Sequence, residues 1–302
     1  MNLLENSKIV FAFFILLGFI FPGFAQYLKF LLVPMVILMM TLSIKGVHLG
    51  HITKQNYKIV IKLMLINYFV YSPILIALSY IFINDIQYRI GFILLASVPP
   101  AASIIPLAYI YHGDIKDSIL SEIASYAFAL IYSPILVFIF LGENISVIHF
   151  IKILFLIILL PMVLARILHR VNLGILEKKN IVINLVYGLS FYIFIGLNHK
   201  IFTTDYISLI PVASIVILVT FGLGSLIFFI LKKKKVKHAQ DILYVLFGTF
   251  KNGNSAATLA IILFSPAAAI PVAVRGLLTP FYFVYLENMF KAHKTSVNRK
   301  PT

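Results

Sequence analysis

Runs of about 20 mostly apolar residues recur from one end of this sequence to the other, with only short polar segments between them. A helix of about 20 apolar residues is long enough to cross the roughly 30 Å hydrocarbon core of a bilayer. The hydrophobic fraction is 61 % and only 12 % of the 302 residues are charged, a composition that would make a water-soluble domain aggregate. The sequence therefore predicts an all-α integral membrane protein, with residues 1–302 forming a single membrane domain.

Ten transmembrane helices are predicted, joined by short connections that favour a compact bundle of antiparallel neighbours. The predicted spans fall at about 8–23, 27–45, 58–83, 89–111, 116–141, 147–168, 181–198, 207–231, 240–264 and 268–290. The chain also divides in the middle, into a first repeat of five spans at about 8–141 and a second at about 147–290. Because five is odd, the two halves would lie in opposite orientations, as in transporters built from inverted repeats.

The basic residues are distributed unevenly between the two sides that ten spans define. Of the 25 Lys and Arg residues, 19 fall on the side that holds both termini, including the run from Lys232 to Lys235, and only 4 fall on the other side. Cytoplasmic loops of membrane proteins carry such an excess. We therefore expect a multi-pass protein of the cytoplasmic membrane with both termini in the cytoplasm. The net charge of +15 is then a matter of orientation in the lipid bilayer and does not indicate a nucleic acid partner.

The sequence gives no indication of an enzyme, a cofactor or a metal site. It contains no cysteine, which excludes disulfides and thiolate metal sites. His48 and His51 are three residues apart in a basic loop, but no third ligand accompanies them. A nucleophile paired with a base is not found at membrane depth either. We therefore do not expect catalysis.

Two predicted spans are unusual, and they hold corresponding positions in the two halves. Span four contains Pro99, Pro100 and Pro106, which remove backbone donors and clash with preceding carbonyls, so a continuous helix is not expected. Span nine contains the polar run Lys-Asn-Gly-Asn-Ser at 251–255. Interrupted helices at matching positions indicate a transport site. The alternative is structural, because prolines also kink membrane helices and small residues such as Gly253 also form close helix contacts.

Three charged residues lie inside the predicted spans. A lysine such as Lys251 near the bilayer centre costs roughly 2.5–3.5 kcal/mol to insert, so it usually faces a partner or a water-filled cavity. Glu122 shares one face of span five with Ser118 and Ser125, although solvation near the cytoplasmic interface is an alternative. Arg275 is expected to extend outward or to pair locally. The candidate residues of the substrate and ion pathway are Pro99, Pro100, Ser103, Ser118, Glu122, Lys251, Asn252, Asn254 and Ser255.

At the two unusual helices the sequence resembles the bile acid:sodium symporter superfamily, over nearly the full length of the chain. Residues 99–103 (Pro-Pro-Ala-Ala-Ser), followed by Tyr109 and by residues 112–114 (His-Gly-Asp), resemble its Pro-Gly-Gly-rich fourth helix. Residues 251–257 resemble its ninth-helix Gln-Asn-Ser-Gly-Leu-Ala segment. Smaller matches are Phe264-Ser265-Pro266, Ile270-Pro271, Pro34-Met35 and Met39-Met40. The auxin efflux carrier family shares this architecture and is the nearest alternative.

The resemblance implies two inverted five-helix repeats in which broken helices four and nine cross. A core of spans three to five and eight to ten would face a panel of spans one, two, six and seven across a substrate cavity. Substrates in such families are mostly organic anions, moved by alternating access. The resemblance therefore implies a secondary transporter of a small organic anion.

The departures from the family concern its sodium ligands. Where the family has a Ser-Asn pair in helix four, this chain has Ile104-Ile105. The helix-nine glutamate falls near Phe247 here, and the glutamine one turn later is replaced by Lys251. A hard cation such as sodium favours several oxygen ligands. This chain has therefore lost most of them.

Of the helix-five ligands that the resemblance implies, Ser118 remains and Glu122 stands in place of a threonine. We predict that Lys251, together with Glu122, replaces the sodium ions and makes transport sodium-independent. The burial of Lys251 would be eased either by Glu122 reaching it or by bonds to exposed carbonyls. Proton release from Lys251 is a further means of coupling. The alternatives are a structural ion pair without a part in coupling, and a non-transporting membrane receptor.

Overall fold

The computed structural model describes residues 3–44, 53–142, 146–168, 178–233 and 238–297. Helix occupies each of the ten predicted ranges, and no strand occurs in these described residues. Of the residues named above, His48, His51, Lys234 and Lys235 lie outside the described residues. The prediction of an all-α protein is confirmed.

In its described residues, the first half of the chain contains eight α-helices and four short turns of other helical types. The α-helices are α1 (Ser7–Ile20), α2 (Ala25–Leu28), α3 (Leu32–Ile44), α4 (Lys54–Leu65), α5 (Ser72–Phe82), α6 (Ile86–Ser97), α7 (Ile104–Ile110) and α8 (Ile115–Leu141). The 3-10 turns are η1 (Leu3–Glu5), η2 (Pro22–Phe24) and η3 (Lys29–Leu31), and the π-helical turn η4 (Ile66–Tyr71) joins α4 to α5.

The second half has a similar series of elements. Its α-helices are α9 (Val147–Leu168), α10 (Lys179–Leu197), α11 (His199–Thr204), α12 (Leu209–Ile217), α13 (Leu223–Lys233), α14 (His238–Phe247), α15 (Gly253–Leu263) and α16 (Ile270–Val297). The 3-10 turns are η7 (Tyr206–Ser208) and η9 (Pro266–Ala269), and the π-helical turn η8 (Leu218–Gly222) joins α12 to α13.

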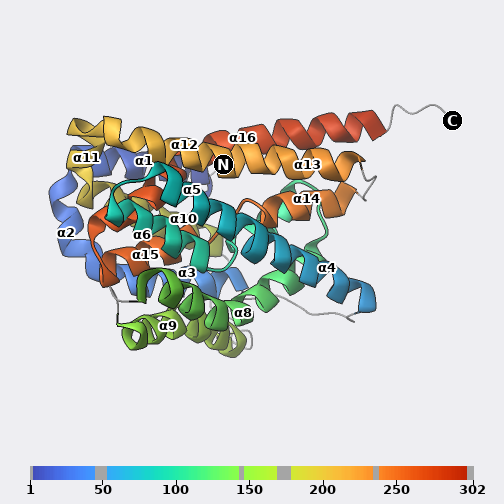
Figure 1. The fold of residues 1–302 in the computed structure, drawn as a ribbon, viewed down its shortest axis with the longest axis horizontal. Helices are drawn as coiled ribbons and strands as arrows, with labels where there is room; N and C mark the ends of the chain where they lie inside the picture. Colours follow the sequence, from blue (N-terminus) through green and yellow to red (C-terminus); the bar gives the residue numbers. More distant parts are fainter. Residues whose placement is uncertain (1–2, 45–52, 143–145, 169–177, 234–237, 298–302) are drawn as a thin grey trace.

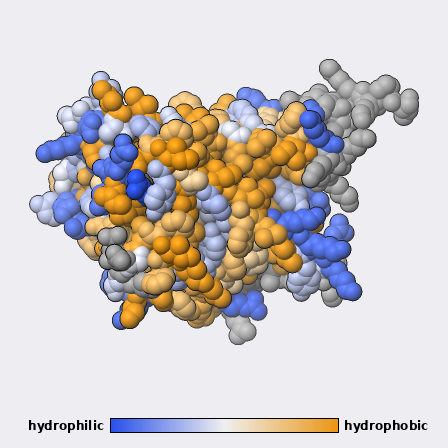
Figure 2. Space-filling model, viewed as in Figure 1, coloured by the Kyte–Doolittle hydropathy of each residue, from blue (hydrophilic) through white to orange (hydrophobic). Residues whose placement is uncertain are grey.

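Seven of the described helices are long and apolar enough to cross a membrane. They are Pro22–Ile44, Lys54–Phe82, Ile115–Leu141, Ile148–Leu168, Asn180–Leu197, Tyr206–Lys233 and Pro266–Lys291, and several of them combine consecutive elements. Three further apolar helices, Ile9–Ile20, Ile86–Ser97 and Gly253–Leu263, are shorter. Two of these three belong to the spans for which an interruption was predicted. Figure 2 shows an apolar surface across the middle of the visible face, with hydrophilic residues gathered toward its two ends.

The helices form two groups by their packing. In one group, α10 packs against α1, α2 and α3, and α9 packs against α3. In the other, α6 packs against α5, α8 and α15, α4 packs against α8, and α12 lies alongside α16 (Figure 1). Contacts of α15 with α3 and α9, of α16 with α10, and of α8 with α9 connect the groups. Helices α6 and α15, which flank the two predicted interruptions, thus lie side by side.

A close approach between α6 and the turn η9 depends on one glycine. A Cβ atom on Gly91 would lie 2.1 Å from the carbonyl oxygen of Ala268 and 2.9 Å from Cδ of Pro271. We expect Gly91→Ala to lower the free energy of unfolding by about 1–3 kcal/mol, because backbone must move to accept the methyl group. Gly23→Ala is the matched control, since no atom lies within 4 Å of its Cβ position. Equal melting temperatures of the two purified variants in detergent would contradict this expectation.

Candidate functional site

The first interruption separates α6 from α7 at residues 98–103. A residue that precedes proline is disfavoured in the helical region, and Val98 accordingly has an extended backbone, with φ −68 and ψ 159. Pro99 and Pro100 follow, and both are buried. Pro106 lies in the first turn of α7, where a missing N–H group is tolerated. The predicted break is therefore present, and the pair of prolines at its start accounts for it.

The second interruption separates α14 from α15 at residues 248–252. Helix α14 ends at Phe247, and the next residue, Gly248, packs closely against Ile227 of α13. A Cβ atom on Gly248 would lie 2.4 Å from Cδ1 of Ile227. Helix α15 begins with Asn252 as its N-cap, whose side-chain oxygen accepts a hydrogen bond from the Ser255 N–H group at 3.1 Å. The predicted role of Asn252 at this break is therefore partly a capping role.

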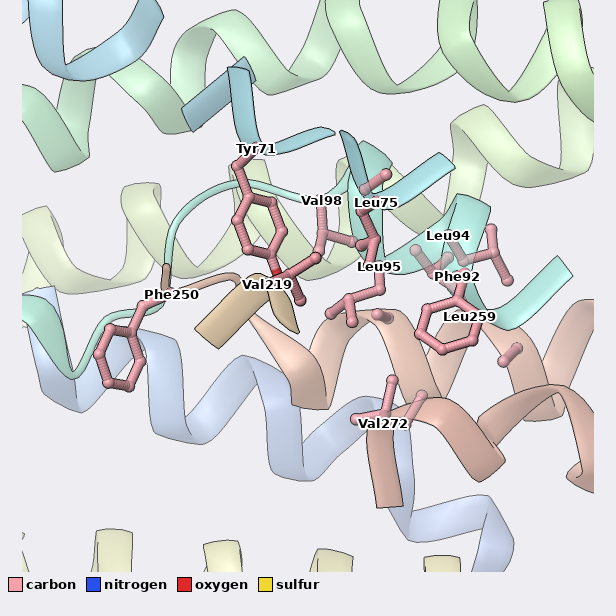
Figure 3. Packing of buried hydrophobic residues seen from close by; sticks show 14 of the residues in the cluster. Tyr71, Leu75, Phe92, Leu94, Leu95, Val98, Val219, Phe250, Leu259 and Val272 are labelled. Carbon is pink, nitrogen blue, oxygen red and sulfur yellow. The ribbon is translucent and has the colours of Figure 1, made fainter. Parts of the chain in front are cut away.

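The two interruptions are bonded to each other. The backbone N–H group of Asn252 donates to the carbonyl oxygen of Pro99 at 2.8 Å. The ammonium group of Lys251 donates to the carbonyl oxygen of Val98 at 3.0 Å. Figure 3 shows Val98 and Phe250, one from each interruption, in the buried cluster. The prediction that the two broken segments meet is confirmed.

Lys251 is enclosed by aromatic rings and backbone. Its side chain belongs to a residue that is only 2 % exposed. The Nζ atom lies 4.4 Å from the ring centroid of Tyr68 and 6.0 Å from that of Tyr71, both in the π-helical turn η4. An ammonium group over an aromatic face is attracted by about 2 kcal/mol when both are desolvated. Within the described residues no carboxylate oxygen lies within 4 Å of this nitrogen, so the groups that hold the Lys251 side chain are neutral: one carbonyl oxygen and two aromatic rings.

Arg275 is a second buried cation at the same place, and its predicted outward orientation is wrong. Its guanidinium group turns inward and donates to the carbonyl oxygens of Lys251 at 3.0 Å and of Thr249 at 2.9 Å. A guanidinium group has several donors in a fixed planar arrangement, so it can bond two carbonyls of one irregular segment at once. The second interruption is therefore held from α16 by a charged side chain.

Asn67 of η4 holds the same segment from the other half of the chain, and the sequence interpretation did not include it. Its side-chain nitrogen donates to the carbonyl oxygens of Phe247 at 2.7 Å and of Phe250 at 3.2 Å. These are carbonyls that the end of α14 leaves without helical partners. A buried amide inside an otherwise apolar run of span three was the signal that could have indicated this role.

Glu122 is buried on α8 and makes no ion pair with Lys251, so the alternative of a structural ion pair between these two residues is wrong. One carboxylate oxygen of Glu122 accepts a hydrogen bond from the Tyr126 hydroxyl at 2.7 Å. Its other oxygen has no partner among the described residues. Of the two ways in which the burial of Lys251 could be eased, the structure uses the carbonyl oxygen. Solvation of Glu122 near a surface is also wrong, because the residue is 1 % exposed.

The remaining candidates are distributed over three places. Ser118 is buried and its hydroxyl donates to the carbonyl of Ile115 within α8. Ser103 is exposed at the start of α7 and does not cap that helix. Asn254 and Ser255 lie in the first turn of α15. The structure thus brings together Pro99, Lys251 and Asn252, and it separates Ser103, Ser118 and Glu122 from them.

The contacts of Asn254 and Ser255 are with methionine sulfurs of α3. The side-chain nitrogen of Asn254 lies 3.5 Å from Sδ of Met39, and the Ser255 hydroxyl lies 3.9 Å from Sδ of Met40. A thioether is a weak acceptor. The side-chain oxygen of Asn254 has no partner among the described residues. These two side chains therefore lie at a contact between the helix groups with much of their hydrogen-bonding capacity unused.

Comparison with known proteins gives no relative, since no family model matches the chain and no curated protein matches it.

Proposed function

We propose that this chain is a secondary transporter of a small organic anion, in which two fixed cations hold the crossing of its interrupted helices. The observation that carries the proposal is the bond from the Lys251 ammonium group to the carbonyl of Val98, which joins one interrupted helix to the other. An unneeded buried lysine would be a continuing cost to a membrane protein. Arg275 is a second buried basic residue at the same segment, and two such residues in one place argue against an explanation by helix packing alone.

The electrostatic basis is the partial negative charge at the C-terminal ends of helices. The ends of α6 and α14 both stop inside the protein at the two interruptions. Lys251 bonds to the carbonyl that follows α6, and Arg275 bonds to two carbonyls that follow α14. In the bile acid:sodium symporter superfamily, which we propose as this chain's family, sodium ions have this task. Lys251 and Arg275 would perform it without a dissociable ion.

Ten spans in two inverted repeats belong to the proposed architecture. Seven long apolar helices and three shorter ones, two of them next to the interruptions, support the number. The repeat is supported by paired irregularities: π-helical turns in predicted spans three and eight, and interruptions in spans four and nine. The packing groups described above match a panel and a core. The basic residues then favour cytoplasmic termini in the cell membrane.

We place the anion at the contact between α15 and α3. The side chains of Asn254 and Ser255 donate there only to thioether sulfurs. A carboxylate oxygen is a much stronger acceptor and would replace these contacts. Because α3 belongs to one packing group and α15 to the other, an anion bound there would separate them, as alternating access requires.

The proposal is tested by measuring anion binding and uptake in different salts. Purified protein would be screened by thermal unfolding against aliphatic monocarboxylates, dicarboxylates and cholate, in sodium, potassium and choline buffers. The best stabilising anion would then be followed into proteoliposomes, with protein-free vesicles as the control. We expect the same stabilisation and the same uptake rate in all three salts, because Lys251 needs no ion to supply its charge. Steep sodium dependence would overturn the fixed-cation proposal, and binding without uptake would favour a receptor.

A further inference from the structure

Glu122 is a buried carboxyl group that the fixed-cation arrangement does not use. The residue is 1 % exposed, one oxygen accepts from the Tyr126 hydroxyl, and the other oxygen has no partner within the described chain. An ionised carboxylate buried without a cation is strongly disfavoured, and such a group binds a proton instead. An intramembrane ionisable residue of this kind is a candidate functional site.

The charged and titratable groups of the elements around α8 do not compensate Glu122. From η4, Tyr68 presents a neutral hydroxyl that donates to the Ser125 carbonyl. On α6, Arg89 bonds to the carbonyl of Ile83 at the C-terminal end of α5, and the Tyr88 hydroxyl lies 3.4 Å from that of Ser208. The other such groups on α4, α7 and α9 with described side chains are exposed: Lys54, Tyr57, Lys58 and Lys62, Tyr109, and His149, Lys152 and Arg166. Lys251 makes no ion pair with Glu122.

A stripe of buried polar side chains leads along α8 toward Glu122. Asp117, Ser118, Ser121, Glu122 and Ser125 share one face of the helix and are all buried. The hydroxyls of Ser121 and Ser125 have no hydrogen-bond partner in the described part of the chain. Serines in helices commonly bond to a carbonyl one turn earlier, and these two do not, so both hydroxyls keep their capacity to donate and accept a hydrogen bond.

The stripe opens into a polar hollow of about 160 Å³ at the first turn of α8. Asp117 lines this hollow, and its carboxylate accepts from the side-chain nitrogen of Asn56 at 2.6 Å. The hollow is lined by Thr53, Gln55, Asn56, Ile59, Asp114, Asp117, Ala239 and Gln240. Glu122 is five positions after Asp117, which is about 7.5 Å along a helix axis. Two or three water molecules would bridge that distance.

We propose that Glu122 is a proton-binding site, supplied from the hollow at Asp117 through the buried serines of α8. A hydronium ion in the hollow gives its proton along the stripe to the free oxygen of Glu122. The carboxylate becomes a neutral carboxyl group, and water is left behind. Nothing else is oxidised or reduced.

The coupling that follows rests on the proposed transporter function. Proton binding removes one negative charge from the helix group that contains α8 and α15. An organic anion at the α15–α3 contact adds one. Carrying both together would leave the charge of the moving group unchanged, and this charge balance favours joint movement of a proton with an anion. The proton would then do the work that the sodium gradient does in the family this chain resembles.

Infrared spectroscopy of the full-length protein in lipid tests the proton site without any substrate. Difference spectra between an acidic and an alkaline buffer isolate carboxyl groups that gain a proton, and a buried group gives a separate carbonyl band. We expect this band in the unmodified protein and its complete loss in Glu122→Gln, which keeps the Tyr126 hydrogen bond. Glu287→Gln is the matched control, because Glu287 is an exposed residue paired with Lys291, and it should retain the band. Asp117 and Asp241 are also buried carboxyl groups, so the Glu122 band is identified as the one that Glu122→Gln removes. A spectrum that Glu122→Gln leaves unchanged, or the absence of any such band from the unmodified protein, would overturn the site.

The path is tested by the rate at which the same band shifts in heavy water. Asp117→Asn should slow the shift several-fold without moving the band, because the group at the entrance no longer exchanges protons. An unchanged rate would overturn the path. Lys251→Met should leave the band in place, since Lys251 does not contact Glu122. If uptake is sodium-independent but the Glu122 band is absent, only the proton-site proposal is contradicted. If the band is present but no anion is taken up, only the proposed transporter function is contradicted.

Discussion

Replacing Lys251 with methionine is expected to abolish anion binding and uptake while leaving the protein at least as stable as before. Methionine has a similar length and no charge, so the space between the two interruptions stays filled. The residue is 2 % exposed and has a carbonyl and two aromatic rings as partners, with no carboxylate that would be left unpaired. The Val98 carbonyl loses a hydrogen bond worth about 1.5–3 kcal/mol. Removal of the lysine also relieves an insertion cost of about 2.5–3.5 kcal/mol, which offsets that loss.

This combination of results separates a functional lysine from a structural one. A structural ion pair would lose stability when one partner is removed, typically by about 3–5 kcal/mol. We therefore expect a melting temperature that is unchanged or higher, together with loss of the stabilisation by anions. Lys152→Met on the exposed face of α9 is the matched control, and it should retain both binding and uptake. A Lys251→Met protein that still takes up the anion at the normal rate would contradict the fixed-cation proposal.

The helices and their interruptions could be predicted because they depend on local chemistry. Apolar runs of sufficient length place helices almost regardless of context, and Pro99 with Pro100 prevents a helix wherever it lies. The ends of α8 and α9 lie within one residue of the predicted spans for the same reason. The meeting of the two interruptions was predicted from the resemblance and from the matching positions, and the bond from Lys251 to Val98 agrees with it.

The partners of the charged residues could not be predicted, because they depend on which faces of distant helices meet. Arg275 was expected to extend outward or to pair locally because it is close to the end of its span, yet it turns inward and bonds to two carbonyls 24 and 26 residues earlier in the chain. Glu122 and Lys251 are both buried, but they do not meet. The ring of Tyr68 contacts Lys251, and the hydroxyl of the same tyrosine bonds to the Ser125 carbonyl on α8, the helix that carries Glu122. No spacing along the chain carries that information.

Replacing Arg275 with methionine is expected to destabilise the protein strongly and to remove uptake with it. The carbonyls of Thr249 and Lys251 would lose two hydrogen bonds from a charged donor, each worth about 1.5–3 kcal/mol. The Thr249 carbonyl would be left unpaired in a buried place, where it keeps its full desolvation cost. The Lys251 carbonyl would keep its bond from the Gly253 N–H group at 2.8 Å. Removal of the Arg275 charge also ends its repulsion with Lys251, which offsets part of this cost. We therefore expect the free energy of unfolding to fall by about 3 kcal/mol.

Two further variants give this expectation its controls. Arg275→Lys should recover part of the stability, because one ammonium group cannot hold both carbonyls in the fixed geometry of a guanidinium group. Arg89→Met removes an arginine that bonds one carbonyl, that of Ile83 at the C-terminal end of α5, away from the interruptions, and it should cost about 1 kcal/mol. Thermal unfolding in detergent and uptake in proteoliposomes would be measured on all three. If Arg275→Met has the same melting temperature as the unmodified protein, the guanidinium group does not hold the second interruption. Lys251 alone would then have to hold the two interruptions together.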